Sequence, residues 1–185
     1  GLTDGFHSDS HLILTPAPAS ANPQRNPPLP MHYPAFSAAI AVRQADQAIA
    51  FYKTAFGAEE RYRLIDPDSG VVGHAELIIR GGLLMLSEEY PAFNKSPETL
   101  GGTAVKLCLM VDDVDAEYAR AIAAGATEIR APSDQFYGHR SACLRDPFGH
   151  EWMLQHEIEK VTPEEMQKRW DAMLGKCPSS EEAAK

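Results

Sequence analysis

The sequence has few cysteines, no concentrated positive charge and no long hydrophobic segment. Its three cysteines are Cys108, Cys143 and Cys177, an odd number without the spacing of a metal site. We therefore expect reduced thiols and a cytoplasmic protein. The net charge of −9, without a basic patch, argues against a nucleic-acid partner. No apolar segment approaches the roughly 20 residues of a membrane helix, so we expect no membrane partner.

The sequence contains a weak internal repeat. Gly57-Ala58 recurs as Gly125-Ala126, and Leu84-Met85-Leu86 recurs as Trp152-Met153-Leu154, both at a spacing of 68 residues. A fixed spacing of this kind predicts two copies of one structural unit. The 185 residues, 44% of them hydrophobic, are enough for two small modules with a common core.

The first copy has the element order β-α-β-β-β. Apolar residues at spacings of three and four predict a helix over 46–56, which Gly57 ends. Alternation and turn residues predict strands over 36–42, 60–65, 72–80 and 83–87.

The second copy has the same order. We expect a strand over 104–111, a helix over about 114–124 that Asp112-Asp113 can cap, and a short strand over 127–130. Asp146-Pro147-Phe148-Gly149 is a typical tight turn, which joins hairpin strands over 141–145 and 151–155.

These elements predict three regions in the chain. An extended arm rich in Pro, Ser, Asn and Ala covers residues 1–33. A two-module domain covers 34–157, with modules at 34–90 and 102–157. Residues 158–185 form a C-terminal helix, starting at Thr162-Pro163, and a tail. The apolar residues Trp170, Met173 and Leu174 on this helix favour a homodimer interface.

Taken together, these modules resemble the vicinal oxygen chelate superfamily of glyoxalase I, bleomycin-resistance proteins and extradiol dioxygenases. The similarity is greatest to its PhnB-like branch. It is carried, in order, by Ala50-Phe51-Tyr52, Phe56-Gly57-Ala58, His74-Ala75-Glu76-Leu77, Leu84-Met85-Leu86, Asp134-Gln135-Phe136-Tyr137-Gly138 and Asp146-Pro147-Phe148-Gly149-His150. The resemblance implies an α+β, glyoxalase-like fold in which two β-α-β-β-β modules form a curled mixed sheet around a ligand cleft. It also implies a dimer.

The resemblance further implies metal ligands on the first and last strand of each module. Those positions fall at Ser37, Met85, Lys106 and Met153. An ammonium group and two thioethers are poor ligands for a hard divalent metal, so we expect no metal and no cofactor. His74 and Glu76 share one strand face and could form a displaced metal site or an acid–base pair. A simple hydrogen-bonded pair is the interpretation we favour.

Strand alternation selects the residues that face the predicted cleft. The cleft and its mouth, which we place in the loop 133–140, are expected to contain Ser37, His74, Glu76, Met85, Lys106, Cys108, Gln135, Phe136, Tyr137, Arg140, Glu151 and Met153. Phe136 and Tyr137 could stack on a ligand, or could simply pack on the body as in an ordinary hairpin loop. Cys108 is expected to be a buried, inert thiol, and His139, His150 and His156 to be solvated.

The predicted function is binding of an unidentified organic small molecule without a metal. Lys106 and Arg140 favour an anionic ligand. One alternative is a metal-dependent lyase or dioxygenase of the same superfamily. Another is a metal-free enzyme that uses His74 and Glu76 in acid–base catalysis. The sequence leaves open whether the protein is a catalyst or a binder.

Overall fold

The computed structural model of the protein describes residues 33–175. The chain divides into a unit of residues 1–30, which lies outside the described range, and a unit of residues 31–185. The predicted N-terminal arm therefore lies outside the described residues, apart from Tyr33, as does the end of the C-terminal tail. No helix within 33–175 is long and apolar enough to cross a membrane.

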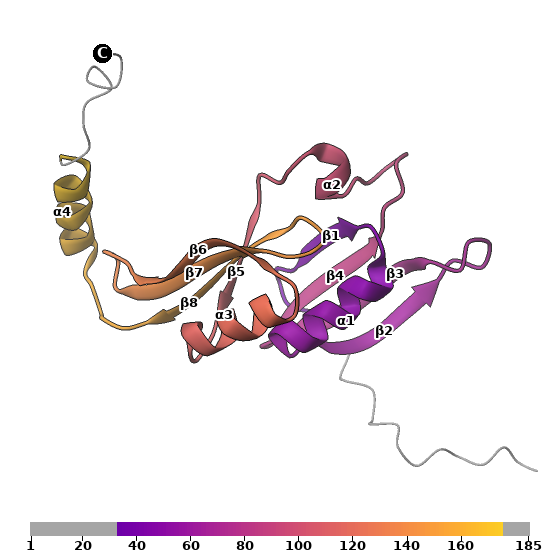
Figure 1. Cartoon of the computed structure of the whole chain (residues 1–185), viewed down its shortest axis with the longest axis horizontal. Coiled ribbons are helices and arrows are strands. Elements are labelled where there is room, and N and C mark those ends of the chain that lie inside the picture. Colours follow the sequence, from indigo (N-terminus) through magenta and orange to yellow (C-terminus); the bar gives the residue numbers. More distant parts are fainter. Residues whose placement is uncertain (1–32, 176–185) are drawn as a thin grey trace, which may run out of the picture. The chain divides into compact units, whose positions relative to one another are not determined.

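The first module contains a four-stranded mixed sheet and one long helix (Figure 1). Its elements are β1 (Ala38–Val42), α1 (Ala45–Phe56), β2 (Glu59–Ile65), β3 (Val72–Ile79) and β4 (Gly82–Glu88). The strand order is β1-β4-β3-β2. β1 runs parallel to β4, and the other pairs are antiparallel.

The second module repeats this arrangement. Its elements are β5 (Lys106–Met110), α3 (Val114–Ala123), β6 (Thr127–Asp134), β7 (His139–Arg145) and β8 (Glu151–Glu157). The order β5-β8-β7-β6 matches the first module strand for strand, which confirms the predicted repeat and fold class. A short helix α2 (Pro97–Leu100) lies between the modules, and α4 (Pro163–Leu174) follows them.

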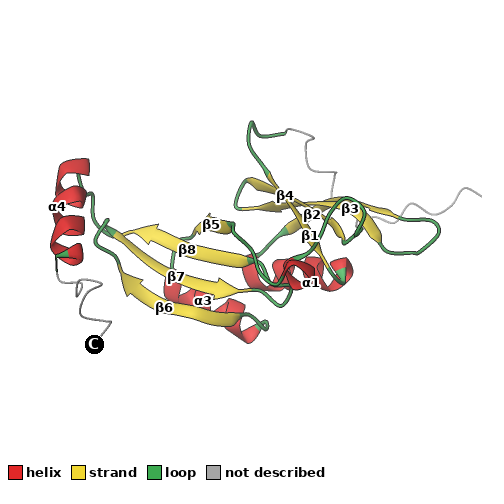
Figure 2. Ribbon diagram, turned by 90° about the horizontal axis from the view of Figure 1, so that it is seen from above, coloured by secondary structure: helices red, strands yellow, loops and turns green. Residues whose placement is uncertain are grey.

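The helices α1 and α3 lie on the same side of the sheets (Figure 2) and pack against each other. The buried face of α1 includes Tyr52 and Phe56, whose rings lie 5.5 and 4.6 Å from the ring of Trp152 in β8. A helix of the first module therefore packs on a strand of the second, so the two modules share one hydrophobic core. Within residues 33–175, α1 and α3 are the helices that pack on the strands, so the opposite face of each sheet carries no packed helix there.

The Asp146 turn ties the modules together. Asp146 Oδ1 accepts hydrogen bonds from the backbone N–H groups of Phe148 and His150, both at 2.9 Å, as the turn residues predict. Its Oδ2 accepts from Tyr52 Oη at 2.7 Å and from Trp152 Nε1 at 2.9 Å. Burial and then the Asp146 carboxylate raise the pKa of Tyr52, which keeps the phenol protonated as a donor.

Two predictions of local structure were wrong, and the expected burial of Cys108 was a third, because that side chain is exposed. The segment 133–140, expected to be a loop, is half strand, because β6 runs to Asp134 and β7 begins at His139, which leaves residues 135–138 as the loop. The strand expected over 127–130 is longer than predicted, and register shifts in the β6–β7 pairing accommodate Pro132 within it. His150 is buried, not solvated, and its Nε2 lies 3.0 Å from the carbonyl oxygen of Ala41. The neighbouring module covers this ring, a contact that strand position alone does not indicate.

Candidate functional site

A cavity of about 810 Å³ lies between β1 and β5, which are the outer strands of their sheets. Its apolar wall includes Phe36, Ala38, Ile40, Leu84, Leu107 and Trp152. Its polar lining includes Lys95, Lys106 and His150, and the predicted site residues Ser37 and Cys108 also line it. The cavity is large enough for an organic molecule of drug-like size, and it combines apolar walls with a few polar groups as ligand sites do.

Lys106 is the predicted site residue that contributes charge to this cavity. Its side chain is 40% exposed, and its Nζ lies 3.6 Å from Glu151 Oε2. Glu151 also accepts a hydrogen bond from Arg145 at 3.0 Å. That bond lowers the pKa of Glu151. Burial acts in the opposite direction, and the positive charges of Lys106 and Arg145 lower the pKa further. Glu151 is shared between Lys106 and Arg145, so it does not neutralise Lys106 alone. Lys95 adds a second ammonium group to the lining, and the cavity therefore keeps a net positive charge.

The open face of the first sheet carries a charged cluster centred on Glu76, whose side chain is only 2% exposed. Glu76 Oε1 accepts hydrogen bonds from Tyr62 Oη at 2.8 Å and Tyr33 Oη at 3.0 Å. Arg61 Nη1 lies 3.1 Å from Glu76 Oε2, and His74 Nε2 lies 3.6 Å from Oε1. Burial alone would raise the pKa of Glu76, but these partners outweigh burial and lower it.

His74 connects this cluster to a smaller cavity of about 200 Å³. The cavity is lined by His74, Met85, Ser87 and Asn94, together with residues 39–41 of β1. The same β1 residues also line the large cavity. β1 therefore has the large cavity on its free edge and the smaller cavity over the open face of its sheet.

The four positions expected to hold a metal are not gathered in one place. Ser37, which precedes β1, lines the large cavity with Lys106, whereas Met85 lines the smaller one. The residues opposite Met85 and Met153 in the parallel pairs are Ala39 and Cys108. Within residues 33–175, no group of three or more His, Cys, Asp or Glu side chains is placed to hold a metal. This donor set does not fit the divalent metal of the family's enzymes.

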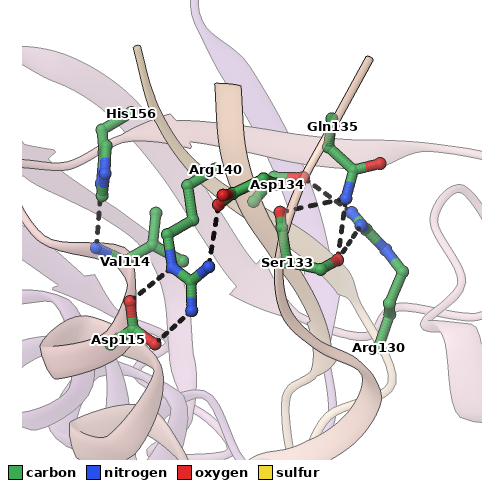
Figure 3. Close-up of polar contacts among 9 residues, drawn as sticks. Val114, Asp115, Arg130, Ser133, Asp134, Gln135, Arg140 and His156 are labelled. Atoms are coloured by element: carbon green, nitrogen blue, oxygen red, sulfur yellow. Dashed lines mark hydrogen bonds and ion pairs between the residues drawn. The ribbon is translucent and has the colours of Figure 1, made fainter. Parts of the chain in front are cut away.

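The predicted mouth residues are not among those that line either cavity: Arg140 lies beside α3 and Phe136 packs on α4. Arg140 donates to both oxygens of Asp115, at 2.6 and 2.8 Å, and to Asp134 at 2.8 Å (Figure 3). These carboxylates raise the pKa of Arg140. Phe136 packs on Trp170 with ring centroids 5.3 Å apart. Gln135 bonds Ser133 at 2.8 Å, and Tyr137 Oη lies 3.3 Å from Ser141 Oγ.

Sequence reasoning missed several residues of these sites. Lys95 stands in the linker between the modules, where no periodicity indicates the direction of a side chain. Tyr33 precedes the first strand and reaches Glu76 from outside the sheet. Arg61 occupies a register irregularity of β2, so strict alternation does not assign its face. Tyr62 directly opposes Glu76 across β2 and β3, and pairing these strands before looking at side chains could have identified it.

The repeat, the shared core and the cavity at the outer strands define a glyoxalase-like protein. Residues 35–154 match the model of the Glyoxalase/Bleomycin resistance protein/Dioxygenase superfamily, and the chain belongs to this superfamily.

Among similar proteins, an uncharacterized protein of Mycobacterium bovis is 41% identical over 138 residues, covering 72% of this chain and 90% of the relative. The crystal structure of TioX from Micromonospora sp. ML1 has a TM-score of 0.53 at 27% identity, covering 68% of this chain and all of that one. A PhnB protein from Bacillus cereus, at 17% identity, shares the fold with a TM-score of 0.52, covering 65% of this chain and 98% of that one.

Proposed function

We propose that the protein binds an anionic organic small molecule in the large cavity and needs no divalent metal to do so. The observation that carries this proposal is the apolar cavity between β1 and β5 with Lys95 and Lys106 in its lining. Apolar walls favour the organic part of a ligand through burial, and the ammonium groups favour its negative charge. Lysine recognises charge without imposing a planar geometry, so a carboxylate, phenolate or phosphate would each be accepted.

A matched pair of fluorescent probes tests this proposal. Anilinonaphthalene sulfonate carries an anionic group, and N-phenyl-1-naphthylamine has the same aromatic rings without it. We expect Lys106→Met to weaken binding of the anionic probe about tenfold, equivalent to about 1.4 kcal/mol, and to leave the neutral probe unaffected. The side chain of Lys168 in α4 is 81% exposed and lines neither cavity, so Lys168→Met serves as the control. Equal loss of both probes, or no loss of either, would count against the proposal.

The metal-free part is tested separately. Elemental analysis of the purified protein should find no stoichiometric zinc, nickel, manganese or iron, and a chelator should leave probe binding unchanged. The alternative of a metal-dependent lyase or dioxygenase would be favoured if the wild-type protein held one of these metals and if replacing His74 or Glu76 removed both the metal and probe binding.

A second candidate function is metal-free acid–base catalysis by His74. Its support is the position of Glu76, which is held by two tyrosine hydroxyls and Arg61 and lies beside an imidazole that lines the smaller cavity. A fixed carboxylate can orient a histidine for proton transfer. Hydrogen–deuterium exchange at the methyl group of pyruvate, followed by NMR, tests this chemistry. Exchange that is catalysed by the protein and lost in His74→Gln would support it.

We further propose that the protein forms a homodimer. α4 has no buried residue, and Trp170, Met173 and Leu174 are 42%, 45% and 50% exposed. Such an apolar stripe commonly marks an interface. Light scattering at micromolar concentration should show a dimer, and Met173→Glu with Leu174→Glu should give a folded monomer. A monomeric wild-type protein would contradict this. The cytoplasmic location remains a prediction.

A further inference from the structure

The open face of the second sheet carries a row of sulfur atoms with no counterpart in the first. Cys108 of β5 directly opposes Met153 of β8, and Met153 directly opposes Cys143 of β7. Their neighbours along these strands, including Trp152 and Leu154, are buried in the core on the helix side. The three sulfur side chains therefore project from the same open face. The equivalent row of the first sheet is Ala39, Met85 and Glu76.

The spacing of this row leaves both thiols available. Neighbouring strands lie about 4.8 Å apart, so two cysteines separated by one strand exceed the Cα–Cα distance of about 7 Å that a disulfide allows. Both cysteines are free thiols, Cys143 buried and Cys108 exposed. Cys108, expected to be buried, is thus open to an incoming ion. Met153 stands between the two, and its flexible thioether can lean toward either.

The charges around the row favour one class of ion. Arg130 Nη2 donates to Cys143 Sγ at 3.6 Å, and Lys106 is two residues from Cys108 on the same strand face. These cations oppose a hard divalent ion, which would also lack carboxylate ligands here because Glu151 is engaged by Arg145 and Lys106. A monovalent soft ion bound by two thiolates gives a complex with a net charge of −1, and the same two cations stabilise that charge. Thiolate and thioether ligands are also those that Cu(I) prefers.

We propose that Cys108, Met153 and Cys143 form a Cu(I) site, with Cys108 and Met153 as the primary ligands and Cys143 as the third. In binding, each thiol that forms a Cu–S bond loses its proton to solvent, and copper stays in the Cu(I) state throughout. Met153 is one of the four positions at which the resemblance places divalent-metal ligands, but Cys108 and Cys143 are not among them. Cys108 also lines the large cavity, yet the Cu(I) site does not depend on the anionic-ligand proposal.

Anaerobic titration with Cu(I), in competition with the chelator bathocuproine disulfonate, tests this site. We expect the full chain to retain one Cu(I), and Cys177→Ser to retain it equally. Cys108→Ser should lower the affinity at least a hundredfold, Met153→Leu about tenfold and Cys143→Ser by a smaller factor. Met85→Leu, the matching methionine of the first sheet, is the control and should have no effect.

Two results would overturn the proposal. One is failure of the wild-type protein to hold Cu(I) against the chelator. The other is retention of Cu(I) by a folded Cys108→Ser variant, with folding checked by circular dichroism. Cys108 is exposed, so its replacement is expected to leave the fold intact even if replacement of the buried Cys143 does not. Lys95→Met separates the two proposals, because it should weaken the anionic probe and leave Cu(I) binding unchanged.

Discussion

The two modules have the same strand order but different open faces. In the first, Glu76 stands beside Met85 and is held by Tyr33, Tyr62 and Arg61. In the second, the residue in the corresponding position beside Met153 is Cys143. Most helix-side residues of both sheets, such as Leu77, Leu86, Leu144 and Leu154, are apolar and buried. The repeat is therefore kept where the modules pack together and differs where a ligand could bind, which places functional differences on the open faces and at the outer strands.

The largest effect is expected at the turn that joins the modules. Asp146→Ala leaves the buried donors of Tyr52 and Trp152 without their acceptor and should lower the free energy of unfolding by about 4 kcal/mol. In the first module, Asp66 accepts two backbone hydrogen bonds in an exposed turn, so Asp66→Ala should cost about 1 kcal/mol. Urea denaturation measures both. Equal losses would contradict the cross-module role of Asp146.

Substitutions on the open faces of the two sheets should lower the free energy of unfolding by less. The loss in the first sheet should depend on pH. Glu76→Gln leaves Arg61 without its carboxylate and should cost about 3 kcal/mol at pH 7, whereas Cys143→Ser should cost about 1 kcal/mol. The folded pKa of Glu76 lies below the ordinary 4.5. Its stabilisation is thus complete above pH 4.5 and is lost as the pH falls through the folded pKa.

Urea denaturation of wild type and Glu76→Gln from pH 7 to pH 3 checks this dependence. The difference between the two proteins should shrink below pH 4.5 and stay constant above it. A difference independent of pH would show that the charge of Glu76 is not what stabilises the cluster.

The smallest expected difference is between two glycines with left-handed backbone. Gly57 ends α1 with φ +66° and has open space around it, so Gly57→Ala should cost about 1 kcal/mol. Gly149 has φ +90°, and a Cβ there would lie 2.8 Å from Pro97 Cβ in α2. Gly149→Ala should cost about 2 to 3 kcal/mol, because it adds this clash to the backbone strain. Thermal unfolding of the two variants compares the costs, and equal shifts would exclude contact between α2 and the turn.

The sequence predicted the fold well because local patterns specify it. The spacing of Ile49, Tyr52 and Phe56 predicts α1, and the Asp146 turn predicts the hairpin. Strand alternation places Met153 on the cleft face, which puts its neighbours Trp152 and Leu154 on the helix side, where both are buried. The length of β6 was underestimated, because the sequence does not reveal how a paired strand accommodates register irregularities such as those between Glu128 and Ser133.

The candidate site was harder to predict because it depends on contacts between distant segments. Lys95 joins Lys106 only through the path of the linker, and Tyr33 meets Glu76 across 43 residues of sequence. Arg140 was expected at the mouth of the cleft, but its position beside α3 follows from Asp115. Residue spacing and composition do not reveal which distant segments meet in the fold. The sequence could therefore indicate which residue types line a site, but not which of them lie together.

The most direct test of the central claim is an NMR titration of the isotope-labelled protein with anilinonaphthalene sulfonate in the presence of a chelator. If the large cavity is the binding site, the amide signals of Ala38–Val42 and Lys106–Met110 should shift with a single binding constant, and Lys106→Met should weaken it. Shifts confined to His74 and Glu76, or to Phe136 and Arg140, with β1 and β5 unaffected, would contradict the account.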